Sequence, residues 1–192
     1  MRAKPKILGR RLVAETRVFR VEEVELEFAN GNRRRFERIP GGQASVLIVP
    51  LLDAHTVLLI REYAAGSDRY ELGLAKGIME AGEDALTAAQ REMREEVGYG
   101  ARDLRQVHTV SLAPGYIQHT THIVLARDLF PHRSEGDEPE PVEVVPWPLQ
   151  DMDGLLERPD FTEARSITAL YLVRRFLERE SGKSSMDEAG VY

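Results

Sequence analysis

Apolar and charged positions alternate along the first forty residues of the chain, which is the pattern of half-buried β structure. The alternating apolar positions are Val18, Val21, Val24, Leu26 and Phe28. This period of two predicts strands between residues 11 and 39, with a hairpin turn at Asn30-Gly31. The alternation slips once, between Val21 and Val24, so we expect a bulge or strand break there. Residues 1–42, the N-terminal ribbon, are too few to fold alone and must pack on another surface.

From residue 43 to residue 180 the pattern changes to buried apolar runs and to helical periods. We predict strands at 45–52, 56–60, 107–112, 122–126 and 142–147, and helices at 84–97 and 163–179. Residues 181–192 are expected to be a frayed, flexible tail. Strands before, between and after helices predict an α/β fold in which a mixed sheet is sandwiched between helices, preceded by the antiparallel N-terminal ribbon.

The helix predicted at 84–97 carries a group of acidic side chains. At 100° per residue, its core face is the stripe Leu86, Ala89, Met93 and Val97. Glu92, Glu95 and Glu96 fall together on a neighbouring face, where Glu92 and Glu96 form a like-charged i, i+4 pair that opposes helix stability. Arg91 can pair with Glu95, which leaves the other two carboxylates without an obvious partner. Such a face is either solvated or a site for a hard cation such as Mg²⁺ or Mn²⁺.

The residues before this helix favour the cation site. Gly73, Gly77 and Gly82 lie in its approach, and Glu83 lies near its start. Glycines allow close backbone approach and turns that other residues resist. A merely solvated acidic surface needs neither.

These residues fill a known pattern. Gly77, five residues, Glu83, seven residues and then the run from Arg91 to Gly98 resemble the Nudix box of the Nudix hydrolase family, with every fixed residue present. Tyr99 departs, because that place usually holds an aliphatic residue. The resemblance implies a loop-helix-loop that binds divalent cations, and it identifies the chain as a hydrolase of diphosphate linkages.

The resemblance also implies roles for individual residues. Glu92 and Glu96 would be the main metal ligands, with Glu95 beside them and the backbone carbonyl of Lys76 as a further ligand. Arg91 would orient the glutamates. The site would be supported structurally by Gly77, Gly82, Glu83 and Gly98.

The chain further resembles the ADP-ribose pyrophosphatase branch of this family, by its β-rich start and by Pro114, which follows the box. That branch implies AMP-releasing hydrolysis of ADP compounds such as NADH, ADP-ribose and short diadenosine polyphosphates, and a homodimer paired through the N-terminal strands. Many members carry an arginine shortly after the strand that ends here at Ile60. In this chain Arg61 comes early and Ala64-Ala65 follows, which fits broader substrate use.

The reaction needs a group that takes a proton from the attacking water. Residues 132–141 form an acidic loop that Pro139 and Pro141 keep out of regular structure. In the family branch a glutamate of this loop is the base or an extra metal ligand, so Glu138 and Glu140 are both candidates; a simply solvated turn is the alternative. For substrate contacts we expect Arg61 and Pro114 to contribute. Tyr63 and Tyr116 could stack on a base, and Phe19 and Arg38 would lie near the adenine. Aromatic side chains of this kind are often core residues instead.

The composition limits the classes of molecule that the protein is expected to bind. With 26 basic and 32 acidic residues the net charge is −6, which is unfavourable for binding polymeric nucleic acid. The absence of cysteine excludes thiolate metal sites, and no apolar run approaches the length of a membrane span. We therefore expect a cytoplasmic enzyme acting on a small nucleotide. Two alternatives remain: a Nudix hydrolase of a sugar nucleotide or coenzyme A, and a non-catalytic Nudix ligand sensor, which would be expected to lack the metal glutamates.

Overall fold

The computed structural model describes residues 2–136 and 139–188, and its contacts divide the chain into two compact units. The first comprises Met1–Ala44 and Ser111–Thr120, and the second comprises Ser45–Val110 and Thr121–Tyr192. The first unit resembles the N-terminal ribbon that the sequence predicts. It also includes the segment Ser111–Thr120, which sequence analysis assigned to the larger domain.

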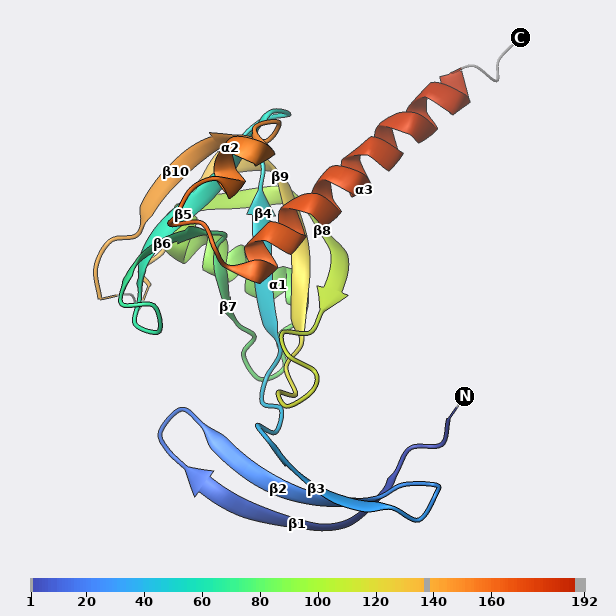
Figure 1. The fold of residues 1–192 in the computed structure, drawn as a ribbon. Helices are drawn as coiled ribbons and strands as arrows, with labels where there is room; N and C mark the ends of the chain where they lie inside the picture. The colour runs from blue at the N-terminus through green and yellow to red at the C-terminus, as the bar shows by residue number, and fades with distance from the viewer. Residues whose placement is uncertain (1, 137–138, 189–192) are drawn as a thin grey trace. The chain divides into compact units, whose positions relative to one another are not determined.

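The first unit is built on a three-stranded antiparallel sheet (Figure 1). Its strands are β1 (Lys6–Glu15), β2 (Arg20–Glu27) and β3 (Arg33–Arg38). Gly31, with φ +83°, makes the predicted turn between β2 and β3. The segment Ser111–Thr120 joins this unit because the backbone amide of Ile39 donates to the carbonyl of Tyr116, at 2.8 Å.

The irregularity expected in the ribbon lies in a different strand. Strand β2 is continuous past Val21 and Val24, so a break there was the wrong expectation. The register instead shifts in β1, between Leu12 and Ala14, opposite Glu22 and Val21. The extra residue is thus accommodated by the partner strand, which is how a bulge restores pairing.

The second unit contains two sheets (Figure 1). The four-stranded sheet has the order β7-β4-β9-β8, with β4 parallel to β9 and the other pairs antiparallel. The three-stranded sheet has the order β10-β5-β6 and is antiparallel. The strands are β4 (Ser45–Pro50), β5 (Thr56–Ala64), β6 (Arg69–Gly73), β7 (Lys76–Ile78), β8 (Tyr99–Val110), β9 (Thr121–Pro131) and β10 (Glu143–Pro148). The mixed sheet is confirmed. Strands β6 and β7 and the first half of β8 were not predicted from the sequence.

Strand β4 shows why the fold is a sandwich, because it is buried on both faces. Leu47 and Val49 pack in one core cluster with Leu170 of helix α3 (Ala164–Glu188). Val46 and Ile48 pack in the other cluster, with Met93 from the opposite side of the sheet. Successive side chains of a strand point to opposite faces, so a continuous apolar run requires cover on both.

The helices differ from the sequence prediction in detail. Helix α3 continues to Glu188, so residues 181–188, expected to fray, are helical. A short helix, α2 (Met152–Leu156), was not predicted. On helix α1 (Ala85–Glu92), Leu86 is exposed whereas Ala85, Ala88 and Ala89 are buried, so the core face is rotated from the stripe we expected. No helix in the described part of the chain is long and apolar enough to cross a membrane.

Candidate active site

The acidic helix begins as predicted and ends in an unexpected conformation. The carboxylate of Asp84 accepts a hydrogen bond from the backbone amide of Thr87, at 2.8 Å, and so caps helix α1 (Ala85–Glu92). The following turn, η1 (Met93–Val97), is a π-helix, in which the amide of Gly98 donates to the carbonyl of Met93. Gly98 ends the helix at φ +80°. Single π turns are frequent at functional sites, and this one carries Glu95 and Glu96.

Two of the predicted metal ligands are buried, which is unusual for carboxylates. Glu92 is 8% exposed and Glu96 is 5% exposed. A β-carbon on Gly77 would overlap the carboxylate of Glu92. The absence of a side chain at Gly77 thus lets strand β7 pass directly over this carboxylate without displacing it.

The other buried carboxylate is held by the neighbouring residue of β7. The backbone amide of Lys76 donates to Oε2 of Glu96 at 3.1 Å, while the Lys76 ammonium pairs with Glu62 on β5. Burial raises the pKa of Glu96 to about 8; Lys76 opposes the rise and Glu92 adds to it. The ionised form of Glu96 therefore needs more positive charge than the described residues supply.

Arg91 connects the acidic side chains. Its Nη1 lies 2.7 Å from Oε1 of Glu92 and 3.3 Å from Oε2 of Glu95. Its Nε and Nη2 both lie 3.1 Å from the carboxylate of Glu83. Pairing with Glu95 alone, as the sequence suggested, is thus incomplete, and Glu92 does have a partner. Arg91 thus contacts Glu83, Glu92 and Glu95 at once, and its orienting role and the supporting role of Glu83 stay predictions.

A divalent cation fits the donors of this site. Among the described residues, no three acidic or histidine side chains converge tightly enough to enclose a metal ion, and Arg91 lies between Glu92 and Glu95. The donors are all oxygens, which Mg²⁺ and Mn²⁺ prefer. The buried pair Glu92 and Glu96 carries like charges whose ionised forms a cation would stabilise.

The acidic loop begins against the π-helix. The amide of His132 donates to the carbonyl of Gly98, and the amide of Ser134 donates to the carbonyl of Arg94, both at 3.0 Å. Gly136 packs on Glu95: a β-carbon added to Gly136 would lie 3.4 Å from the Cβ of Glu95, which is ordinary van der Waals contact. The start of the loop is thereby fixed beside the glutamates. Glu138, one of the two candidate bases, lies outside the described residues.

The end of the loop lines a pocket beside strands β5 and β6. Glu140, Pro139 and Pro141 line this pocket together with Arg61, Glu62, Tyr63 and Tyr70. Arg61 is held by Asp160 and by Glu143, which lies 2.9 Å from its Nε. The structure thus brings Arg61, Tyr63 and Glu140 together. Tyr70 and Asp160 were missed by the sequence analysis, since no local pattern marks either residue.

The remaining substrate-contact candidates belong to the first unit. Arg38, Pro114 and Tyr116 line one pocket there, so strand β3 and the segment Ser111–Thr120 bring them together. Phe19 is exposed and does not line that pocket. Arg38 is paired with Glu22 at 2.5 Å.

Comparison with known proteins decides the family. The NUDIX domain model matches residues 41–171, and the model of the NudE-type Nudix hydrolase N-terminal domain matches residues 5–38. The chain belongs to the Nudix family. The Nudix match includes the glycine-rich approach, helix α1 and η1, and with them the buried Glu92 and Glu96.

Relatives and solved structures agree with this assignment. The chain is 52% identical to ADP compounds hydrolase NudE of Escherichia coli, over 91% of this chain and 94% of the relative. It is 27% identical to ADP-ribose pyrophosphatase of Bacillus subtilis, over 88% of this chain and 95% of the relative. A crystal structure of an ADP compounds hydrolase superposes with a TM-score of 0.88 at 50% identity, covering 94% of this chain and 97% of that one.

Proposed function

We propose that this Nudix protein is a hydrolase that cleaves the diphosphate linkage of ADP-containing compounds and releases AMP. The observation that carries the proposal is the buried pair Glu92 and Glu96 beneath Gly77, in a chain half identical to an ADP compounds hydrolase over nearly its whole length. ADP-ribose, NADH and short diadenosine polyphosphates are the substrates we expect.

The chain's own residues position the reactants. Glu92, Glu95, Glu96 and the carbonyl of Lys76 are the groups that would hold Mg²⁺ or Mn²⁺. A bound divalent ion supplies positive charge for the diphosphate oxygens and makes water more acidic. Arg91 keeps Glu92 and Glu95 in place through the contacts described above. Since phosphoryl transfer depends mainly on positioning and charge neutralisation, this set needs only a proton acceptor to be complete.

We propose that the acidic loop supplies the acceptor, from Glu140 or Glu138. The loop starts against η1, which carries Glu95, and this placement keeps the loop near the glutamates. Glu140 is also a candidate additional ligand. Arg61, Tyr63, Arg38, Pro114, Tyr116 and Phe19 remain the proposed substrate contacts.

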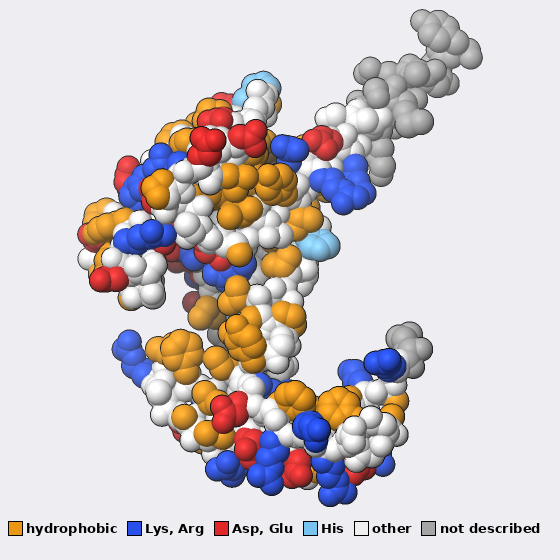
Figure 2. All heavy atoms as spheres, in the orientation of Figure 1, with side chains coloured by type: hydrophobic (Ala, Val, Ile, Leu, Met, Phe, Trp, Pro, Cys, Tyr) orange, Lys and Arg blue, Asp and Glu red, His pale blue; other side chains and the backbone are white. Residues whose placement is uncertain are grey.

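We also propose that the protein acts as a homodimer paired through the N-terminal ribbon. Hydrophobic side chains lie on the surface of the ribbon (Figure 2). Large apolar side chains there are about half exposed in the single chain: Ile7, Leu8, Leu12, Phe19 and Phe36. Exposed apolar area of this kind on a sheet favours association with a second copy.

A substrate panel tests the function. Purified protein is incubated with Mg²⁺ and ADP-ribose, NADH, an ADP-sugar, a UDP-sugar or coenzyme A, and products are separated chromatographically. We expect AMP from the first two, and no product when a chelator removes the metal. Turnover of the UDP-sugar or coenzyme A alone would assign a different diphosphate substrate within the same family. No turnover of any compound, with metal present, would favour a ligand sensor.

A further inference from the structure

A tyrosine that the Nudix box does not include holds the end of the acidic loop. The phenol of Tyr70, on strand β6, donates a hydrogen bond to Oε1 of Glu140 at 2.6 Å. The acceptor is separated from Tyr70 by seventy positions in the sequence. The contact therefore joins the loop to the β5–β6 hairpin.

The ring of Tyr70 is itself held in place. Tyr63 is its direct partner on β5, and the two rings meet edge to face with centroids 5.5 Å apart. The hydroxyl of Tyr63 donates to Asp68 at 2.5 Å. Both rings thus have defined positions although each is about half exposed.

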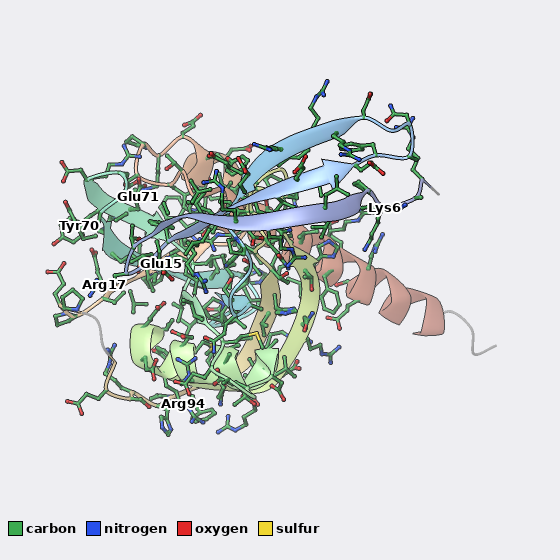
Figure 3. The ribbon with its side chains drawn as sticks, turned by 90° about the horizontal axis from the view of Figure 1, so that it is seen from below. Lys6, Glu15, Arg17, Tyr70, Glu71 and Arg94 are labelled. Carbon is green, nitrogen blue, oxygen red and sulfur yellow. The ribbon has the colours of Figure 1, made fainter. Side chains whose placement is uncertain are left out.

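Strand alternation separates Tyr70 from its neighbour. Figure 3 shows Tyr70 and Glu71 next to each other on β6. Tyr70 lines the pocket of Glu140, whereas Glu71 lines a different pocket with Thr162 and Glu163. Side chains of adjacent strand residues point to opposite faces, so Tyr70 alone of this pair can reach the loop.

The two ends of the acidic loop are therefore fixed at different places. Its start is bound to η1 through Ser134 and Gly136, beside Glu95. Its end is bound to Tyr70 through Glu140. A hydrogen bond from a phenol to an ionised carboxylate is among the stronger ones in proteins, which suits it to hold a loop in one conformation.

We propose that Tyr70 is a positioning residue for hydrolysis: by binding Glu140 it fixes the end of the acidic loop in the pocket that Arg61 and Tyr63 also line. This inference rests on the proposed function. Tyr70 acts through Glu140 and not on the reacting atoms. The contribution of Tyr70 to the hydrolysis rate should therefore come from its hydroxyl group and not from its ring.

Tyr70→Phe tests the inference because it removes the hydroxyl and keeps the ring pair. We expect kcat for ADP-ribose to fall about tenfold, the value of one hydrogen bond to a charged group, with KM changing less than about twofold. Tyr171→Phe is the control, since Tyr171 is a comparably exposed phenol on helix α3, and it should match the wild type. In a Glu140→Ala background, which lacks the acceptor, Tyr70→Phe should cause little further loss, because both changes remove the same contact. Equal losses in the two backgrounds would overturn the proposal.

Hydrogen exchange gives a readout that does not depend on activity. The peptide containing residues 139–143 should exchange faster in Tyr70→Phe than in the wild type or in Tyr171→Phe. Unchanged exchange would show that Tyr70 does not hold the loop, even if kcat falls. If the wild type hydrolyses no ADP compound, the proposed function fails, whereas the exchange experiment still decides whether the loop is held.

Discussion

Gly77 lies directly over the carboxylate of Glu92, so close that a single added carbon atom would overlap it. The two residues come from different elements, strand β7 and helix α1. Their approach brings the backbone of the glycine-rich segment against the acidic helix. A larger side chain at position 77 would therefore force the carboxylate of Glu92 or strand β7 to move.

Gly77→Ala is therefore expected to reduce kcat strongly while the protein stays folded. The added methyl group must displace Glu92 or β7 by roughly 1 Å, and a misplacement of that size can cost about 10²-fold in rate. Steady-state kinetics with ADP-ribose, together with circular dichroism, would measure this. Gly66→Ala is the matched control, because nothing lies within 4 Å of the added atom there. Wild-type kcat in Gly77→Ala would contradict the role assigned to this contact.

Glu96→Gln should abolish most turnover. It removes a charged oxygen from the proposed cation site, and a loss of about 4 kcal/mol in transition-state stabilisation corresponds to roughly 10³-fold in kcat. The fold should remain, because glutamine has nearly the same volume and needs no counter-charge when buried. Titration with Mn²⁺ should also show weaker metal binding. Normal activity with unchanged circular dichroism would remove Glu96 from the metal site.

Glu138→Gln and Glu140→Gln, made separately, should differ from each other. Loss of a general base typically costs about 10²- to 10⁴-fold in rate, so one variant should lose most of kcat. The other should lose little, or mainly affinity for the metal. The pH dependence of kcat, measured for both, should change on its acid side only in the damaging variant. If both keep wild-type kcat, the proton acceptor is elsewhere and Glu95 is the next residue to replace.

Asp160→Asn should destabilise the protein in a pH-dependent manner. Arg158, and then Arg61, hold the pKa of Asp160 at about 2, below its ordinary 3.8. A lowered pKa in the folded state contributes stability above pH 4, and that contribution is lost as the pH falls toward 2. We expect a loss of about 2 kcal/mol in the free energy of unfolding at pH 7, shrinking toward zero near pH 2.

Urea unfolding at pH 7 and pH 3 measures this difference. Asp128→Asn is the control, because its carboxylate is exposed and pairs with an exposed Arg102, and exposed pairs contribute about 1 kcal/mol or less. A loss at Asp160 that is the same at both pH values would mean that packing, and not the charge, is responsible.

Light scattering tests the proposed dimer. At micromolar concentration we expect about twice the 21.7 kDa mass of the chain. Leu12→Glu places a charge among the exposed apolar side chains of the ribbon and should shift the protein toward monomer. A fully active wild-type monomer would refute a functional dimer.

The sequence by itself determined the local features of this protein. Helix α1, its acidic side chains and the buried apolar run of β4 follow from periodicity and spacing over a few residues. The Nudix resemblance adds roles because its motif is also local. These features need no knowledge of what the chain packs against.

Tertiary structure decided the contacts between distant residues. Gly77 lies over Glu92, Tyr70 binds Glu140, and Arg61 pairs with Asp160 across ninety-nine positions. Even the π-helical turn and the place of the β1 bulge depend on neighbouring strands and loops. Such pairings are set by how sheets and helices pack. A hydrophobic period of two or 3.6 residues indicates which face of a strand or helix is buried, but not which residue of another element contacts it.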